Sequence, residues 1–194
     1  MKSIVPDSNP KPLRPAVFFD RDGVVNRSPG PGYVLDWDVF EFNPGFFEAF
    51  GAVKNAGWLV VLITSQKGVG KGLMTQADLD EIHGNLQDSL RAKFGRGFDG
   101  IYAFTGTPDC PHQSKPDPEM IHAAAEELGI DLARSWMIGD ADRDILMGKA
   151  AGLAGTIRLL GEKPVGEGAE AVFTIENSTE MAAQLMEIMS ISGD

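Results

Sequence analysis

The chain has 194 residues, 43% of them hydrophobic and 23% charged, which is typical of a globular protein that can bury a full core. Its formal net charge of −11 argues against a nucleic-acid partner, because a phosphate backbone needs a basic surface. The single cysteine excludes an internal disulfide, and no apolar stretch approaches the roughly 20 residues that span a bilayer, so we predict a cytoplasmic protein without a membrane partner.

Strand-like and helical segments alternate along the chain. Residues 1–14 are rich in proline and have no hydrophobic segment, so we expect an N-terminal tail there and not a signal peptide. An apolar run predicts a strand over 16–19, and a loop rich in Pro and Gly follows over 27–38. Further strands are predicted at 40–42, 58–63, 100–104, 136–138, 156–160 and 171–175, with helices ending near residues 55, 94, 128, 151 and 189. This order predicts one α/β domain over 15–194, a three-layer Rossmann-like parallel sheet with helices on both faces.

The first strand runs directly into two aspartates and a glycine. Asp20 and Asp22 are one residue apart, and Gly23 allows a sharp turn and leaves room for a ligand beside the backbone. Asp-x-Asp is a weak signal by itself, but this pair and the aspartates of 140–144 directly follow strand-like runs. Open α/β folds bind ligands at the carboxyl edge of the sheet, so we expect both groups to lie there.

Polar groups at these strand ends have the chemistry of a phosphate-processing site. Asp20 is the candidate nucleophile, since a carboxylate can form an aspartyl-phosphate that water later hydrolyses. Asp22 is the candidate acid and base, and crowding by other carboxylates should raise its pKa. Thr64 would donate a hydrogen bond to the phosphoryl oxygens, and Lys115 would neutralise their charge. Asp140 and Asp144 would hold a metal, and Mg²⁺ suits carboxylates together with a substrate phosphate.

The ordered motifs resemble those of the haloacid dehalogenase superfamily of phosphatases. They are Phe19-Asp20-Arg21-Asp22-Gly23, Thr64-Ser65-Gln66, Lys115-Pro116, and Gly139-Asp140 with Asp144. Further stretches, including Gly32-Tyr33-Val34 and Cys110-Pro111-His112, are similar to the branch of heptose bisphosphate and histidinol-phosphate phosphatases. The resemblance implies a core with no large cap domain and an Mg²⁺ held by Asp20, the backbone carbonyl of Asp22, Asp140 and, through water, Asp144.

Several positions depart from the pattern of that branch. Its zinc loop has four ligands, of which Cys110 and His112 remain here, so we predict no zinc. Ser114 stands where the branch has an arginine, which weakens the case for a second substrate phosphate and predicts only about a tenfold preference for bisphosphates. Ser65 replaces an asparagine, and Ala141 stands where a lysine often follows the metal-binding aspartate.

These observations predict a Mg²⁺-dependent phosphatase that acts, as a monomer, on a small phosphorylated sugar such as D-glycero-D-manno-heptose 1,7-bisphosphate. The candidate substrate contacts are Tyr33, Ser65, Gln66, Lys67 and Ser114. Histidinol phosphate is an alternative substrate, and a polynucleotide 3′-phosphatase would share the motifs but conflicts with the acidic charge. A catalytically silent binding protein on the same fold is the remaining alternative, although binding alone would not need both aspartates of the first motif.

Overall fold

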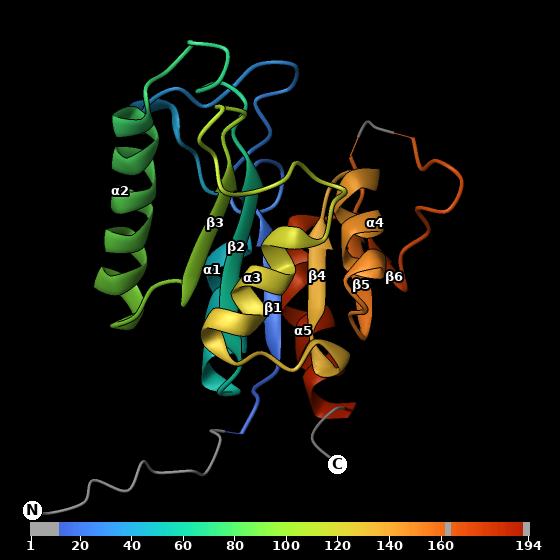
Figure 1. The fold of residues 1–194 in the computed structure, drawn as a ribbon. Coiled ribbons are helices and arrows are strands. Elements are labelled where there is room, and N and C mark those ends of the chain that lie inside the picture. Colours follow the sequence, from blue (N-terminus) through green and yellow to red (C-terminus); the bar gives the residue numbers. More distant parts are fainter. Residues whose placement is uncertain (1–11, 162–163, 192–194) are drawn as a thin grey trace, which may run out of the picture.

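Six parallel strands form one sheet through the middle of the molecule (Figure 1). The computed structural model describes residues 12–161 and 164–191, so the first eleven residues of the predicted tail lie outside the described part. The strands follow the spatial order β3-β2-β1-β4-β5-β6. Their bounds are β1 Ala16–Asp20, β2 Leu59–Ser65, β3 Gly100–Phe104, β4 Trp136–Gly139, β5 Gly155–Leu159 and β6 Phe173–Ile175. β1 therefore lies inside the sheet, with β2 and β3 on one side and β4, β5 and β6 on the other. The strand order reverses at β1, which makes its carboxyl end a topological switch point.

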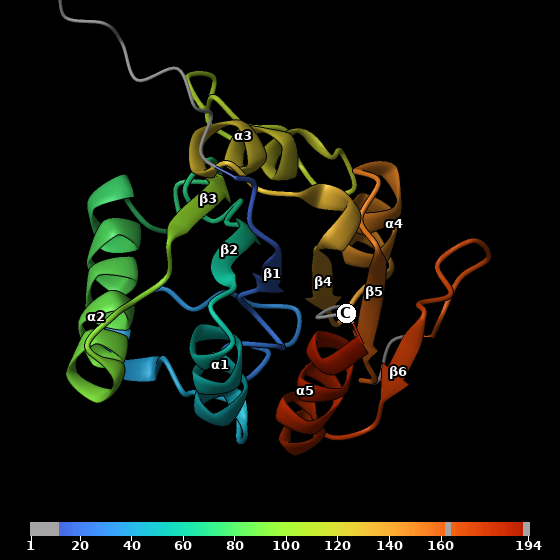
Figure 2. The ribbon, with the colours of Figure 1, turned by 90° about the horizontal axis from the view of Figure 1, so that it is seen from below.

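Helices cover both faces of the sheet, as Figure 2 shows. On one face lie α1 (Phe46–Asn55), α2 (Gln76–Phe94) and α5 (Met181–Ile191), and on the other lie α3 (Glu119–Leu128) and α4 (Asp142–Ala150). Short 3-10 helices, η1 to η3, cover Trp37–Val39, Leu132–Arg134 and Ser178–Glu180. The predicted three-layer α/β architecture is confirmed.

Adjacent residues of β1 belong to two separate hydrophobic cores. Phe19 packs in the core beneath α1, α2 and α5, whereas Phe18 packs with Met120 of α3 and Met147 of α4. Successive side chains of a strand point to opposite faces, so a fully apolar strand fills both cores. Burial on both faces holds β1 firmly in place and thereby fixes the position of Asp20 at its end.

One predicted strand was wrong. Residues 40–42 form no strand, and Phe42 makes one isolated bridge with Asn26. The ring centroids of Trp37 and Phe40 lie 4.8 Å apart, and those of Phe40 and Phe42 lie 5.1 Å apart. Phe42 also stacks on Phe46 of α1 at 5.9 Å. The alternate aromatic residues thus join one cluster against a helix, which the alternating pattern cannot distinguish from the buried face of a strand.

The second strand extends beyond its predicted end. Thr64 and Ser65 still pair with Ala103 and Phe104 of β3, so two polar residues belong to the sheet itself. The helix that follows begins at its predicted cap, where Asp78 N donates to Thr75 Oγ1 and Thr75 N donates to Asp78 Oδ2. Within the described residues, no helix is long and apolar enough to cross a membrane.

Candidate active site

Three buried carboxylates meet at the carboxyl edge of the sheet. Asp20 ends β1, Asp140 follows β4, and Asp144 lies in the first turn of α4. One carboxylate oxygen from each lies within 4.8 Å of the others, and no other such cluster of potential metal ligands occurs among residues 12–161 and 164–191. The predicted grouping of strand ends therefore exists. Gly23 is required beside it, since it has φ +98° and a Cβ there would overlap the Asp140 carboxylate.

Lys115 reaches into this cluster from the loop before α3. Its Nζ donates to Asp20 Oδ1 at 2.6 Å and to Asp144 Oδ1 at 2.8 Å, and its side chain is fully buried. Burial would lower the pKa of Lys115, but the carboxylates of Asp144 and Asp20 outweigh it and raise that pKa. Burial and the nearby Asp144 raise the pKa of Asp20 to about 7, against the opposing effect of Lys115. A fixed positive charge thus lies beside the candidate nucleophile.

The cluster fits a divalent cation that prefers oxygen ligands. All three side chains are carboxylates, and Oδ2 of Asp20 is buried without a hydrogen-bond partner. An unpaired buried carboxylate oxygen is costly, and a bound cation would satisfy it. Mg²⁺ is held in proteins by one or two carboxylates with waters and substrate phosphates, which this donor set can supply.

Asp22 lies outside this cluster and has a different environment. Its carboxylate accepts hydrogen bonds from Nε and Nη2 of Arg21, from Nδ2 of Asn26 at 3.0 Å and from Nε2 of Gln66 at 2.9 Å. Burial would raise the pKa of Asp22, but Arg21, Gln66 and Asn26 outweigh it and lower that pKa. The expected rise in pKa is therefore wrong, because donors surround this carboxylate where other carboxylates were expected.

Gln66 joins the first and second motifs behind the site. Its Nε2 donates to Asp22 Oδ2 and, at 2.7 Å, to Thr64 Oγ1, and the residue is completely buried. Because Thr64 Oγ1 accepts this bond, its hydroxyl proton is left to donate elsewhere. The neighbouring Ser65 Oγ is buried and has no hydrogen-bond partner. Gln66 is not among the residues that line the adjoining cavity, and its role as a substrate contact stays a prediction.

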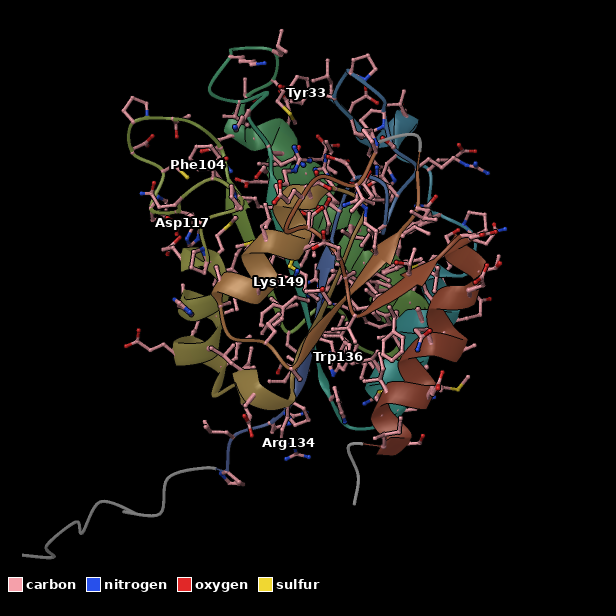
Figure 3. The ribbon with its side chains drawn as sticks, turned by 90° about the vertical axis from the view of Figure 1, so that its right-hand side faces the viewer. Tyr33, Phe104, Asp117, Arg134, Trp136 and Lys149 are labelled. Atoms are coloured by element: carbon pink, nitrogen blue, oxygen red, sulfur yellow. The ribbon has the colours of Figure 1, made fainter. Side chains whose placement is uncertain are left out.

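A cavity of about 260 Å³ adjoins the site beneath the loop that follows β1. Figure 3 shows Tyr33 at the loop end of the molecule, far from Arg134 at the opposite end. Four of the five predicted substrate contacts line the cavity, namely Tyr33, Ser65, Lys67 and Ser114, together with Asp22 and Lys115. Arg143 also lines it and was missed by the sequence reading.

Arg143 lacks any motif that would have marked it. It is an exposed residue near the start of α4, where a charged side chain is expected in any globular protein. Burial would lower the pKa of Arg143, but the carboxylates of Asp144, Asp20 and Asp140 outweigh it and raise that pKa. The guanidinium therefore lies within the electrostatic field of the acidic cluster.

The remnants of the zinc loop face other partners. Cys110 Sγ lies 3.4 Å from Thr105 N, which donates to it, and His112 Nδ1 lies 3.2 Å from the carboxylate oxygens of Glu119. Neither residue belongs to a cluster of three possible metal ligands in the described part of the chain. The prediction that the protein holds no zinc remains a prediction.

Comparison with known proteins agrees with this arrangement. A family model for haloacid dehalogenase-like hydrolases matches residues 31–152. The chain is 36% identical over 176 residues to the D-glycero-beta-D-manno-heptose-1,7-bisphosphate 7-phosphatase of Vibrio cholerae serotype O1, covering 84% of this chain and 90% of the relative. The enzyme of the same name from Helicobacter pylori strain J99 is 39% identical over 152 residues, covering 77% of this chain and 85% of the relative.

A solved structure extends the similarity to three dimensions. The D,D-heptose 1,7-bisphosphate phosphatase of B. bronchiseptica, solved in complex with magnesium and phosphate, superposes with a TM-score of 0.75 at 29% identity. The superposition covers 89% of this chain and 98% of that structure. The sheet order, the acidic cluster with its lysine and these similarities lead to one conclusion: the chain belongs to the haloacid dehalogenase-like hydrolases and, within them, to the phosphatases.

Proposed function

We propose that this chain is a Mg²⁺-dependent sugar-phosphate phosphatase whose substrate is D-glycero-D-manno-heptose 1,7-bisphosphate. The observation that carries the proposal is the state of Asp20: Lys115 donates to one of its oxygens, and the other is buried without a hydrogen-bond partner. Lys115 and Asp22 in turn line the adjoining cavity. The activity named for the relatives supports the choice of substrate. We further propose that the protein is a single-domain monomer that acts in the cytoplasm, where charged sugar phosphates are retained because they cross membranes poorly.

The first chemical step transfers the phosphoryl group to Asp20. The carboxylate attacks phosphorus and a P–O bond to the sugar breaks, while Asp22 gives its proton to the leaving oxygen. The hydrogen bonds to Asp22 favour its ionised form, so it must take up that proton from solvent as the phosphate dianion approaches and raises its proton affinity. Lys115 stabilises the charge that develops near Asp20.

The second step releases inorganic phosphate. Asp22, now ionised, removes a proton from a water molecule, which attacks the phosphorus of the aspartyl-phosphate and restores the Asp20 carboxylate. Thr64 and Ser65 provide hydroxyl donors for the phosphoryl oxygens, and Gln66 orients Thr64 and Asp22. Asp20, Asp140, Asp144 and the Asp22 carbonyl would hold Mg²⁺, and the ion would neutralise charge on the phosphoryl oxygens.

Phosphate release from the heptose bisphosphate and from histidinol phosphate tests this function. We expect Mg²⁺-dependent release from the former at a kcat/KM at least about 100-fold higher, since the cavity carries cationic side chains for a second anion. Asp20→Asn should remove more than about 99.9% of the activity while the circular dichroism spectrum stays that of the wild type. If Asp20→Asn kept a few per cent of the wild-type rate, the aspartyl-phosphate route would be wrong.

A further inference from the structure

Arg143 is a cation at the catalytic cavity that the reaction at Asp20 does not use. It lies between Asp142 and Asp144 on α4 and lines the cavity with Asp22 and Lys115. Among the described residues, no hydrogen bond or ion pair engages its guanidinium, whereas both of its acidic neighbours are occupied. Asp142 is bonded by Arg158 at 2.7 Å, and Asp144 by Lys115 at 2.8 Å.

The other cations near the cavity already have partners. The ammonium of Lys67 lies 5.7 Å from the ring centroid of Phe104, and that of Lys71 lies 5.4 Å from that of Tyr33. Lys115 is fully buried between two carboxylates. Of these side chains, Arg143 alone combines access to the cavity with a fork of donors, which matches the oxygens of a phosphate in pairs.

We propose that Arg143 binds the phosphate of a sugar bisphosphate that is not transferred, an inference that rests on the proposed function. Ser114, beside Lys115 in the cavity, carries no charge. The cation for a second anion is therefore Arg143 of α4. Lys115 already places positive charge beside Asp20, which leaves Arg143 for the second anion in the same cavity. The bisphosphate preference of the wild type is then about a hundredfold, and no longer the tenfold expected from Ser114.

Kinetics with a matched bisphosphate and monophosphate of one sugar test the proposal. We expect Arg143→Ala to lower kcat/KM for the bisphosphate about 30-fold or more and to change that for the monophosphate less than threefold. Arg143→Lys should recover part of the loss, because it keeps the charge but not the fork of donors. Arg134→Ala removes an exposed arginine at the opposite end of the molecule and should leave kcat/KM for both substrates unchanged (Figure 3).

Two outcomes would overturn the proposal and one would overturn its foundation. Equal losses for both substrates would place Arg143 on the transferred phosphate, and no loss for either would remove it from binding. A wild type that hydrolyses neither sugar phosphate would instead refute the proposed function. Calorimetry of bisphosphate binding to Asp20→Asn gives a readout independent of turnover: adding Arg143→Ala should weaken binding of the bisphosphate about 30-fold and leave the monophosphate unchanged.

Discussion

The guanidinium of Arg21 donates to both carboxylate oxygens of the adjacent Asp22, with Nη2 3.0 Å from Oδ1 and 3.2 Å from Oδ2. Arg21 is completely buried, and the Asp22 side chain is 20% exposed. The two aspartates at the end of β1 therefore have different partners: Lys115 donates to the Asp20 carboxylate, and Arg21 donates to the Asp22 carboxylate. Their separation allows two carboxylates in one site to take different roles.

Removal of the Arg21 charge should destabilise the fold. We expect Arg21→Met to lower the free energy of unfolding by about 3 kcal/mol, because it leaves the Asp22 carboxylate with fewer donors in a largely buried position. Urea denaturation measures the change. Arg91→Met is the matched control, since its ion pair with Asp88 is exposed on both sides and should contribute little. Equal stability of the two variants would contradict this account of the buried pair.

Loss of the Gln66 amide should affect the rate more than substrate binding. Gln66→Leu removes the donor shared by Asp22 and Thr64, and we expect kcat to fall about 10- to 100-fold with a smaller change in KM. Steady-state kinetics on the preferred substrate separates the two constants. Gln87→Leu, which removes an amide bonded to Phe98, serves as a control away from the site. A change confined to KM would instead make Gln66 a substrate contact.

The free energy of unfolding should decrease as the pH is lowered, because His83 titrates differently in the folded and unfolded chain. Its Nε2 lies 3.4 Å from Nη1 of Arg21, which can only donate, so the imidazole accepts and stays neutral. Burial and the Arg21 charge lower the pKa of His83 to about 3, from an ordinary value of 6.5. Between these values the unfolded chain binds a proton that the folded chain does not, so acid favours unfolding.

His83→Gln tests this pH effect. The wild type should lose about 1–2 kcal/mol from this residue between pH 7 and pH 5, and the variant should lack that part of the pH dependence. Urea denaturation at a series of pH values measures both proteins. The same slope for the two would show that His83 is protonated as readily in the folded as in the unfolded state. His122→Gln, a change to an exposed histidine of α3, is the control.

Metal analysis and metal removal should show that the activity depends on Mg²⁺ and that the protein binds no zinc. We expect purified protein to contain less than about 0.1 zinc per chain, because Cys110 and His112 face other partners and a structural zinc needs four ligands. EDTA should abolish phosphate release and Mg²⁺ should restore it. Asp140→Asn should raise the Mg²⁺ concentration needed for half activity at least about tenfold. Elemental analysis with about one zinc per chain would overturn the first expectation.

Much of the fold follows from local patterns. Residues close together in the sequence indicate the strand before Asp20, by its apolar run, and the start of α2, by the capping pair Thr75 and Asp78. Both predicted positions agree with the structure. The order of the phosphatase motifs also predicted that Lys115 belongs to one site with Asp20, although 95 residues separate them, and the structure adds the hydrogen bond between the two. Motifs succeed here because the strands are parallel, so that their carboxyl ends meet at one edge.

Other features depend on how side chains turn in space. Arg21 bends back onto Asp22, which reversed the expected pKa shift, and nothing in the order of residues indicates that direction. Arg143 lines one cavity with residues 28–33, more than 100 residues earlier in the chain, which is a tertiary relationship. Phe42 belongs to an aromatic cluster under α1 for the same reason.

Gly23 has a consequence for the proposed metal site. The turns that follow β1 and β4 approach so closely that no side chain fits between Gly23 and Asp140. The backbone therefore sets the spacing of the acidic groups, and Lys115 neutralises part of their repulsion before any cation arrives. A site built in this way would not have to fold around the proposed Mg²⁺, so we expect the sheet edge to keep the same arrangement with and without the ion.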